Sequence, residues 1–338
     1  MKPFKTLTAL ALALVAAALA SSVAAEPVEI RIHWAVVPGH LAPLIAKAPA
    51  HVQPHYGKSY VVEPIFMAGS GPGLQALAAG ELELSGLSPQ ALVLATVEGK
   101  LDLKVIGQQV STEVPGYASN GFWVRKDSGI NKIADLKGKK IGVNARGSSI
   151  DAAVKTMLTR HGLKDGDDYQ MVEVRFPAQL PALEAKRIDL AALLQPFGYM
   201  AEAKGTYKQL FSIGDALGPS ETVTWIGRAD WIKENRAALV DFLEDNIRFR
   251  KWATDPKTRP EAIKVLAEVA KRKSEIYADW AFTKRDSYRD PQCLVNVARF
   301  QKNVDDLVKL GLLPRRIDVS QKIDNSLAEE AAKRFTTH

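Results

Sequence analysis

Strand-like and helix-like segments alternate along the first two thirds of this 338-residue chain, and this order most limits the folds open to it. The segment 28–34 alternates apolar and polar side chains, as a strand with one buried face does. Helical stretches of about ten residues, such as 88–97 and 149–161, separate most of the strand signals. The further strand signals lie at 60–67, 82–87, 103–107, 121–125, 139–143, 170–175, 188–193 and 222–227. This order predicts βαβ units and a mostly parallel sheet.

The pattern changes after Asp230. Apolar residues then recur at helical spacing, and Pro256 and Pro314 end two of these runs. We expect the last third of the chain to form helices that pack on one part of the molecule.

One helix-turn-strand unit occurs twice. The segments 74–87 and 180–193 carry the same residue at six of fourteen positions. Two lobes of the same α/β design would explain the match, and so would any Ala/Leu-rich helix that enters a strand. Because the unit occurs only twice, a solenoid is excluded.

The first 25 residues have the three parts of a secretory signal. Lys2 and Lys5 precede an uncharged run at 7–20, and small residues follow at 21–25. The run is shorter than the roughly 20 residues of a spanning helix. No cysteine lies near the cleavage site, so lipid anchoring is not expected. We expect a mature chain from residue 26 onwards, released into the periplasm.

The loop after the first strand is a candidate binding loop, because ligands of open α/β sheets bind at the carboxyl ends of strands. Trp34 could offer a stacking face there and His40 a hydrogen-bond donor. A core tryptophan and a solvated histidine would fit the sequence as well. In the next such loop, the glycines at 69–73 lack the dinucleotide-binding spacing, but Ser70 and helix-start N–H groups could hold a small anion.

The segment 144–151 has the same character in the second part of the chain. Ser148 is a predicted N-cap with Asp151 three residues later, which is the pattern of a capping box. Arg146 has no role in such a cap. An arginine beside a helix start can make paired hydrogen bonds to a sulfonate or carboxylate.

Catalytic, metal and nucleic-acid signatures are weak. His51 and His55 are four residues apart, but Pro54 lies between them and the glutamate of a zinc-protease motif is missing. The single cysteine, Cys293, lies in the helical region and reads as a buried thiol. The net charge of +7 is spread along the chain without a basic stripe. We expect no enzyme activity, no metal, no cofactor and no nucleic-acid partner.

Several motifs in order resemble a known family. They are Gly69-Ser70-Gly71, the segments 76–83 and 121–130, and the string DLKGKKIGV at 135–143. Together they resemble the periplasmic solute-binding proteins of the nitrate/sulfonate/taurine class of ABC importers, within the NMT1/THI5-like superfamily. One departure is at Thr222-Val223, where some amine-binding members carry an acid. Its absence weakens a taurine assignment.

The resemblance implies a bilobed α/β fold of periplasmic binding protein type II, with two mixed or parallel sheets flanked by helices and a hinge between the lobes. Lobe 1 would contain residues 26–115 and 223–338, and lobe 2 residues 116–222. Carried over by position, the ligand-binding residues would be Trp34, His40, Ser70, Ser88, Arg146, Ser148, Ser149, Gln195 and Thr222.

The function implied is capture of a small organic anion, a sulfonate or carboxylate, in the cleft between the lobes. Phe197 and Tyr199 leave room for an aromatic body. The protein would be a monomer that delivers its solute to an ABC permease in the inner membrane. An enzyme on the same fold, a binder of thiamin-pyrimidine or other heteroaromatic compounds, and a sensory binding protein remain alternatives.

Overall fold

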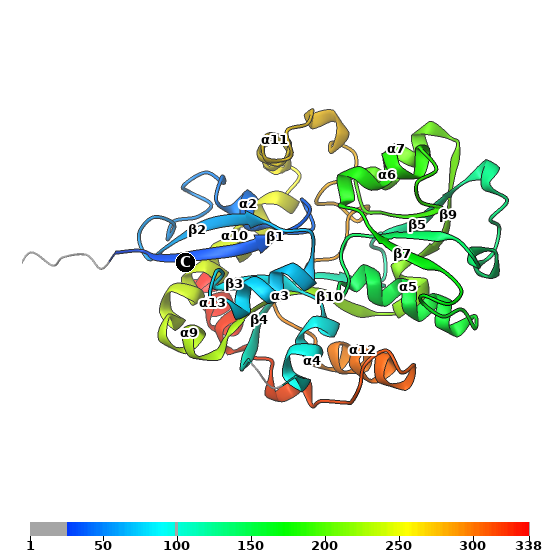
Figure 1. The fold of residues 1–338 in the computed structure, drawn as a ribbon. Coiled ribbons are helices and arrows are strands. Elements are labelled where there is room, and N and C mark those ends of the chain that lie inside the picture. Colours follow the sequence, from blue (N-terminus) through cyan, green and yellow to red (C-terminus); the bar gives the residue numbers. More distant parts are fainter. Residues whose placement is uncertain (1–25, 99–100, 338) are drawn as a thin grey trace, which may run out of the picture.

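Two five-stranded sheets organise the computed structural model, which describes residues 26–98 and 101–337. The predicted secretory signal at 1–25 lies outside the described residues. The first sheet contains β1 (Val28–Trp34), β2 (Tyr60–Phe66), β3 (Leu84–Leu87), β4 (Leu103–Thr112) and β10 (Ser220–Arg228). The second contains β5 (Gly121–Arg125), β6 (Lys140–Val143), β7 (Gln170–Glu173), β8 (Leu190–Leu193) and β9 (Tyr207–Ser212). Figure 1 shows the two sheets side by side, each with its own helices.

The two sheets have the same topology. The strand order is β2-β1-β3-β10-β4 in the first and β7-β6-β8-β5-β9 in the second. In each sheet one strand, β10 or β5, runs antiparallel to both of its neighbours. The mostly parallel sheet predicted from the sequence is therefore two mixed sheets, as the family resemblance implied. The edge strand β9 was not predicted.

The repeated helix-turn-strand unit occurs once in each sheet. Its first copy contains α3 (Ser70–Ala78) and β3, and its second contains α6 (Phe176–Glu184) and β8. Both strands hold the third position of their sheet. The sequence match thus coincides with structurally equivalent places in two similarly built parts, which we call the first and second lobes after their sheets.

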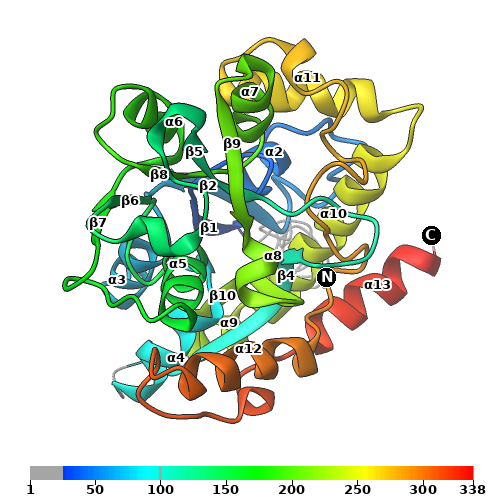
Figure 2. The same ribbon diagram turned by 90° about the vertical axis from the view of Figure 1, so that its right-hand side faces the viewer.

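Helices flank both sheets. The second lobe also carries α5 (Ser149–Arg160), α7 (Phe197–Lys204) and α8 (Ile213–Leu217). The first lobe also carries α2 (Ala42–Ile45), α4 (Pro89–Val97), α9 (Ala229–Glu234), α10 (Arg236–Thr254), α11 (Arg259–Ala270), α12 (Val297–Lys309) and α13 (Ser326–Thr337). The predicted helical wrap of the last third therefore belongs to the first lobe, with α12 and α13 along one edge of the molecule (Figure 2). Among the described residues, no helix combines the length and apolarity that crossing a membrane requires.

The main chain crosses between the lobes twice. It leaves the first sheet after Thr112, at the end of β4, and returns at Ser220, where β10 begins. A later segment of the first lobe, 284–290, runs beside the outgoing crossover. There the Ala118 N–H donates to the Lys284 carbonyl at 2.9 Å and the Asn120 side-chain amide to the Ser287 hydroxyl at 3.1 Å. Two covalent crossovers and one hydrogen-bonded strap thus connect the lobes.

Candidate ligand-binding site

A cavity of about 70 Å³ lies between the two lobes. Its walls are the loops that follow β1 and β2 in the first lobe and β6, β7 and β8 in the second, together with the start of β10. Because parallel strands end at the same edge of a sheet, these loops from each lobe face a common space. Among the described residues, those that line the cavity include no carboxylate and no Lys or Arg.

Two helix starts face the cavity. Ser70 is the first residue of α3, and Ser148 is the N-cap of α5. The Ser148 hydroxyl accepts a hydrogen bond from the Asp151 N–H at 3.2 Å, which confirms the predicted cap. The returning arm differs from a standard capping box, because the Asp151 carboxylate accepts from the Gly147 N–H at 3.1 Å. Unpaired N–H groups at helix starts favour anions.

Hydrogen bonds join the lobes around the cavity. The Ser88 hydroxyl donates to the Gly147 carbonyl at 2.9 Å, and the Asn144 amide donates to the Ala68 carbonyl at 2.8 Å. At a third place the Gln90 amide donates to the Asp151 carboxylate at 3.4 Å. The structure therefore represents an arrangement in which the two lobes touch.

The glycine-rich turn makes this contact possible. A Cβ added at Gly71 would lie 2.7 Å from the Arg146 carbonyl oxygen, which belongs to the backbone of the other lobe. A Cβ at Gly69 would lie 2.3 Å from the Asn144 amide nitrogen. Glycine at these two positions allows the second lobe to approach closely. The space left by the missing Cβ atoms is filled by that lobe and is not available to a nucleotide.

Buried polar side chains lie along the cavity wall, and Gln109, which does not itself line the cavity, lies beside Gly86 of that wall. His33 and His40 line the cavity, with ring centroids 5.6 Å apart. The His33 Nδ1 lies 2.9 Å from the Ser85 hydroxyl, while its Nε2 and both amide atoms of the fully buried Gln109 have no hydrogen-bond partner. Buried polar atoms without partners cost about 1–3 kcal/mol each. A ligand or ordered water that supplied the missing bonds would recover that free energy.

Burial keeps both histidines neutral. Desolvation, together with the neighbouring His40, lowers the pKa of His33 to about 3. Desolvation is also the main cause that lowers the pKa of His40 to about 4. At neutral pH each ring therefore offers one donor and one acceptor rather than a positive charge.

Five of the nine predicted ligand-binding residues line the cavity. They are His40, Ser70, Ser148, Ser149 and Thr222. Ser88 lies beside it as the N-cap of α4 and as one of the bonds between the lobes. Four polar residues that line the cavity were not among the predicted ones: His33, Asn120, Asn144 and Ser287. The sequence held no signal for His33, because this residue occupies a polar position of the apolar-polar alternation and its burial depends on the neighbouring elements.

Three predicted residues lie elsewhere. The Trp34 ring packs on Phe66, with centroids 5.1 Å apart, in the first lobe. The Gln195 side chain accepts from the Tyr199 N–H at 2.9 Å at the start of α7, so it serves that helix. Arg146 turns outward to Asp165, with Nη1 to Oδ2 at 2.7 Å, and half of its side chain is exposed. None of the three lines the cavity.

The aromatic residues of α7 also face away from it. The Tyr199 hydroxyl donates to the Arg285 carbonyl at 2.8 Å, and the Arg272 guanidinium lies 5.3 Å from the Phe197 ring centroid. Both contacts run from the second lobe to the segment after α11 in the first. They add to the contact between the lobes and not to the cavity wall.

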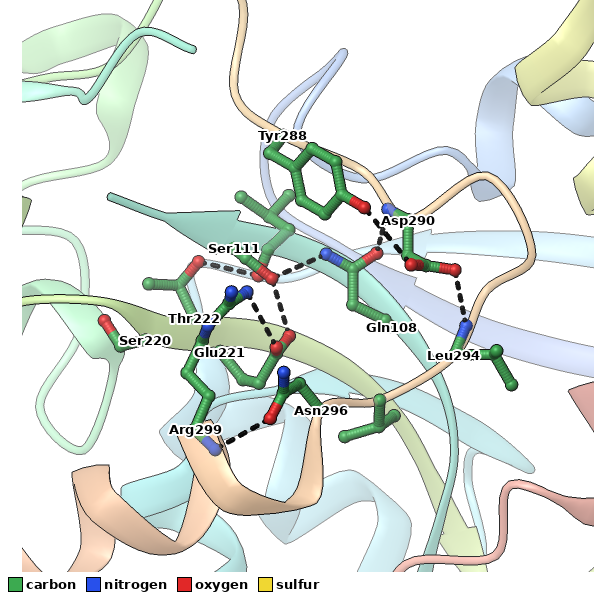
Figure 3. A network of polar contacts seen from close by, with 12 residues as sticks. Gln108, Ser111, Ser220, Glu221, Thr222, Tyr288, Asp290, Leu294, Asn296 and Arg299 are labelled. Atoms are coloured by element: carbon green, nitrogen blue, oxygen red, sulfur yellow. Dashed lines mark hydrogen bonds and ion pairs between the residues drawn. The ribbon is translucent and has the colours of Figure 1, made fainter. Parts of the chain in front are cut away.

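A buried carboxylate lies next to the cavity but points elsewhere. Glu221 precedes Thr222 on β10, accepts a hydrogen bond from Ser111 at 2.7 Å and pairs with Arg299 at 3.3 Å (Figure 3). Burial raises its pKa to about 7. Glu221 therefore does not supply the cavity with the acid that some amine-binding members carry at the position of Thr222-Val223.

Replacing Arg146 with alanine is expected to change solute affinity by less than about threefold, because its side chain does not line the cavity and its exposed ion pair with Asp165 is a weak contact within one lobe. Asn144→Ala is the matched comparison. It removes the bond to Ala68, and we expect affinity to fall about three- to tenfold. Titration calorimetry with the solute found for the wild type would measure both. A larger loss of solute affinity in Arg146→Ala than in Asn144→Ala would indicate that Arg146 belongs to the binding site.

The two mixed α/β sheets, with a cavity between them, have the fold of periplasmic binding proteins. Residues 62–253 match the family model described as NMT1/THI5 like, and the chain belongs to that family. The match covers more than half of the chain and includes strands of both sheets.

Curated relatives match over a shorter stretch. A Haemophilus influenzae protein named "Putative thiamine biosynthesis protein" is 30% identical over 169 residues, which are 50% of each chain. A Brucella abortus protein named as a binding protein is 32% identical over 171 residues, 49% of each chain. The chain thus spans about half the length of the curated relatives it matches.

Solved structures share the fold at low identity. The alkanesulfonate-binding protein SsuA of Xanthomonas axonopodis pv. citri, bound to MOPS, matches with a TM-score of 0.69 and 20% identity over 89% of this chain and 100% of its own. The nitrate-binding protein NrtA of Synechocystis PCC 6803 has a TM-score of 0.71 and 16% identity, over 93% and 90%. The desulfurization enzyme DszB also matches, with a TM-score of 0.61 and 15% identity over 91% and 99%.

Proposed function

We propose that this protein is the solute-binding component of an ABC importer, which takes a small solute into the cavity between its lobes in the periplasm and delivers it to a membrane permease. The observation that carries the proposal is the cavity itself, lined from both lobes and surrounded by hydrogen bonds between them. Membership of the NMT1/THI5 like family supports it. A solute that contacts both lobes would shift the population from open to closed.

The proposal treats the lobes as hinged units with the boundaries expected from the sequence, 26–115 plus 223–338 and 116–222, although β10 of the first sheet already begins at Ser220. The two crossovers are then the hinge. The mature protein would be a monomer, because one closed pair of lobes already completes the cavity. The names of SsuA and NrtA, an alkanesulfonate binder and a nitrate binder, agree with import as the role.

A small organic anion, a sulfonate or carboxylate, is the proposed solute. The starts of α3 and α5 supply N–H groups, the lining has hydroxyl groups, and no carboxylate repels a negative charge. Because Arg146 points away from the cavity, these uncharged donors must replace the hydration shell of the anion. A cavity of about 70 Å³ is small beside the roughly 300–1,000 Å³ of drug-sized ligand sites, which favours a compact solute.

A neutral heteroaromatic ring is the second candidate. The observation that favours it is the cluster of neutral His33 and His40 with the unpartnered Gln109 amide, since such groups pair with the donors and acceptors of a ring. The name of the Haemophilus influenzae relative points to the same chemistry. An ammonium such as that of taurine has no carboxylate among the lining residues of the described chain.

Binding rather than catalysis is proposed, although the fold also occurs in DszB. Burial raises the pKa of the Cys293 thiol to about 11, so at neutral pH this cysteine is a poor nucleophile. If the protein converted its bound solute into a product, the enzyme alternative would replace the proposal. Sensing in place of transport would be indicated by a receptor gene, and not a permease gene, beside its own.

Native mass spectrometry of the purified protein, followed by a thermal-shift panel, tests the function. The panel contains alkanesulfonates, small carboxylates, nitrate and pyrimidines. A solute at 100 times its dissociation constant should raise the free energy of unfolding by about 2.7 kcal/mol. We expect a compact sulfonate or carboxylate to give this shift. A response to pyrimidines alone would select the second candidate, and a panel without any response would contradict both.

A further inference from the structure

A second and larger cavity lies within the first lobe, away from the space between the helix starts. Its volume is about 530 Å³. The later part of α10, the segment 282–292 and the end of α13 surround it, and Tyr117 of the outgoing crossover completes the wall. The proposed function does not use this cavity, although Ser287 lines both.

All charged side chains among the described residues that line this second cavity are basic. Arg250, Lys251, Lys284 and Arg289 line the cavity, and among the described residues no carboxylate does. Arg250 is 4% exposed, and its hydrogen-bond acceptors are all uncharged. They are the side chain of Gln108 at 3.1 Å, the Gln108 carbonyl and the Asp290 carbonyl at 2.5 Å. A buried cation without an anionic partner is costly.

The two arginines also have spare donors. The buried Nε–H groups of Arg250 and Arg289 have no hydrogen-bond partner, although Arg289 donates from its other nitrogens to Asp286 at 3.1 Å and to the Pro38 carbonyl at 2.7 Å. A guanidinium N–H is best satisfied by a carboxylate or sulfonate oxygen. The Nε–H groups themselves are covered by protein, so an anionic group in the cavity would act on the two guanidinium groups through its charge.

Uncharged residues form the rest of the wall, and many of them are apolar. Its large apolar side chains are Leu41, Ile247, Phe249, Phe282 and Phe335. The volume lies within the roughly 300–1,000 Å³ of drug-sized ligand sites. We propose that this cavity is a second binding site, which takes an amphiphilic organic acid with one anionic head and an aliphatic or aromatic body.

Decanoate, decanol and acetate are the probes, because they separate the whole amphiphile from its tail and its head. Titration calorimetry on the mature protein should show saturable binding of one decanoate, with decanol and acetate each at least about tenfold weaker. A tenfold difference is about 1.4 kcal/mol, within reach of one charge-assisted hydrogen bond. Equal affinities for decanoate and decanol would overturn the proposal.

Site-specific methyl NMR locates the bound molecule. Ile247 lines the second cavity, whereas Ile150 and Ile213 line the cavity between the lobes. Decanoate should shift the methyl signal of Ile247 and leave the other two in place. Shifts confined to Ile150 and Ile213 would mean that decanoate enters the first cavity, and this would contradict the second site without affecting the proposed function.

Two variants complete the test. Ala332→Phe places a ring in the second cavity and should abolish decanoate binding. Because this variant could misfold, Lys251→Gln with Lys284→Gln is the second, since both lysines are exposed. It should weaken decanoate about fivefold. Lys257→Gln with Lys264→Gln removes the same charge from exposed positions outside the lining and should bind as the wild type does. Equal losses in both lysine pairs would overturn the proposal.

Discussion

Replacing Gly71 with alanine is expected to weaken solute binding about ten- to a hundredfold while leaving the fold intact. The new Cβ would lie 2.7 Å from the Arg146 carbonyl oxygen, a backbone atom that cannot move aside alone. Overpacking of this kind costs about 1–3 kcal/mol. The cost falls only on the arrangement in which the lobes touch.

The same substitution should not reduce stability. Gly71 lies inside α3, where alanine is favoured over glycine by about 0.5–1 kcal/mol. A melting temperature equal to or above that of the wild type, together with a weaker affinity by calorimetry, is the expected pair of results. This separates a defect in closure from a defect in folding.

Gly39→Ala is the matched control. Gly39 lines the same cavity, but an added Cβ would meet only Val36 of its own loop, at 3.4 Å. We expect its affinity to stay within about threefold of the wild type, because that distance is an ordinary contact. If Gly71→Ala bound its solute as tightly as Gly39→Ala, the contact between the lobes would not belong to the bound state.

The second large effect is on the pH dependence of stability. The pKa of His33 is about 3 in the folded protein, against an ordinary value of 6.5. As the pH falls below about 6.5, His33 binds a proton in the unfolded chain, whereas in the folded protein it stays neutral down to about pH 3. The wild type therefore loses about 1 kcal/mol per pH unit through this residue within that window.

His33→Gln removes this loss. Compared with the wild type, the variant should gain about 2 kcal/mol in the free energy of unfolding between about pH 7 and pH 4.5. Urea unfolding at several pH values measures the gain. Ser85→Ala is the control, because it removes the hydrogen-bond partner of His33 and keeps the titrating ring. Parallel curves for His33→Gln and the wild type would contradict the burial of a neutral ring.

The comparison must be made between variants, because Glu221 acts in the opposite sense. Its pKa is raised from 4.5 to about 7, so the folded protein holds a proton that the unfolded chain has released between those values. That group therefore stabilises the protein as the pH falls from about 7 towards 4.5. His40, with its pKa lowered to about 4, acts in the same sense as His33, and in the wild-type curve Glu221 partly cancels the contributions of the two histidines.

Local patterns predicted what local interactions decide. Alternation found most of the strands, and the serine three residues before Asp151 identified the cap of α5. The strand β9 lies at the edge of its sheet, beside β5. Its sequence Tyr-Lys-Gln-Leu-Phe-Ser does not alternate apolar and polar residues, so it carried no clear strand pattern. The repeated unit indicated two lobes of the same design, and its strand is the third strand in each sheet.

The sequence could not decide where a side chain points when its partner is distant. Arg146 stands at the end of a strand, as a ligand-binding arginine would, but Asp165 of the same lobe draws it outward. Trp34 is the last residue of β1, and its ring packs on Phe66 of the neighbouring strand β2. The bonds of Asn144 and Ser88 across the cavity depend on how two separately folded parts meet.

The place of β10 has a consequence for biosynthesis. This strand lies between β3 and β4, yet it follows them by more than a hundred residues and comes after every strand of the second sheet. While the chain is emerging, β3 and β4 therefore expose unpaired edges, which are templates for aggregation. All strands of the second sheet lie within 121–212 and can pair among themselves first. A nascent chain that ends before residue 220 would thus contain a complete second sheet and an incomplete first sheet with unpaired strand edges. Because such edges favour aggregation during folding, we expect the early strands to need protection by chaperones until β10 has been made.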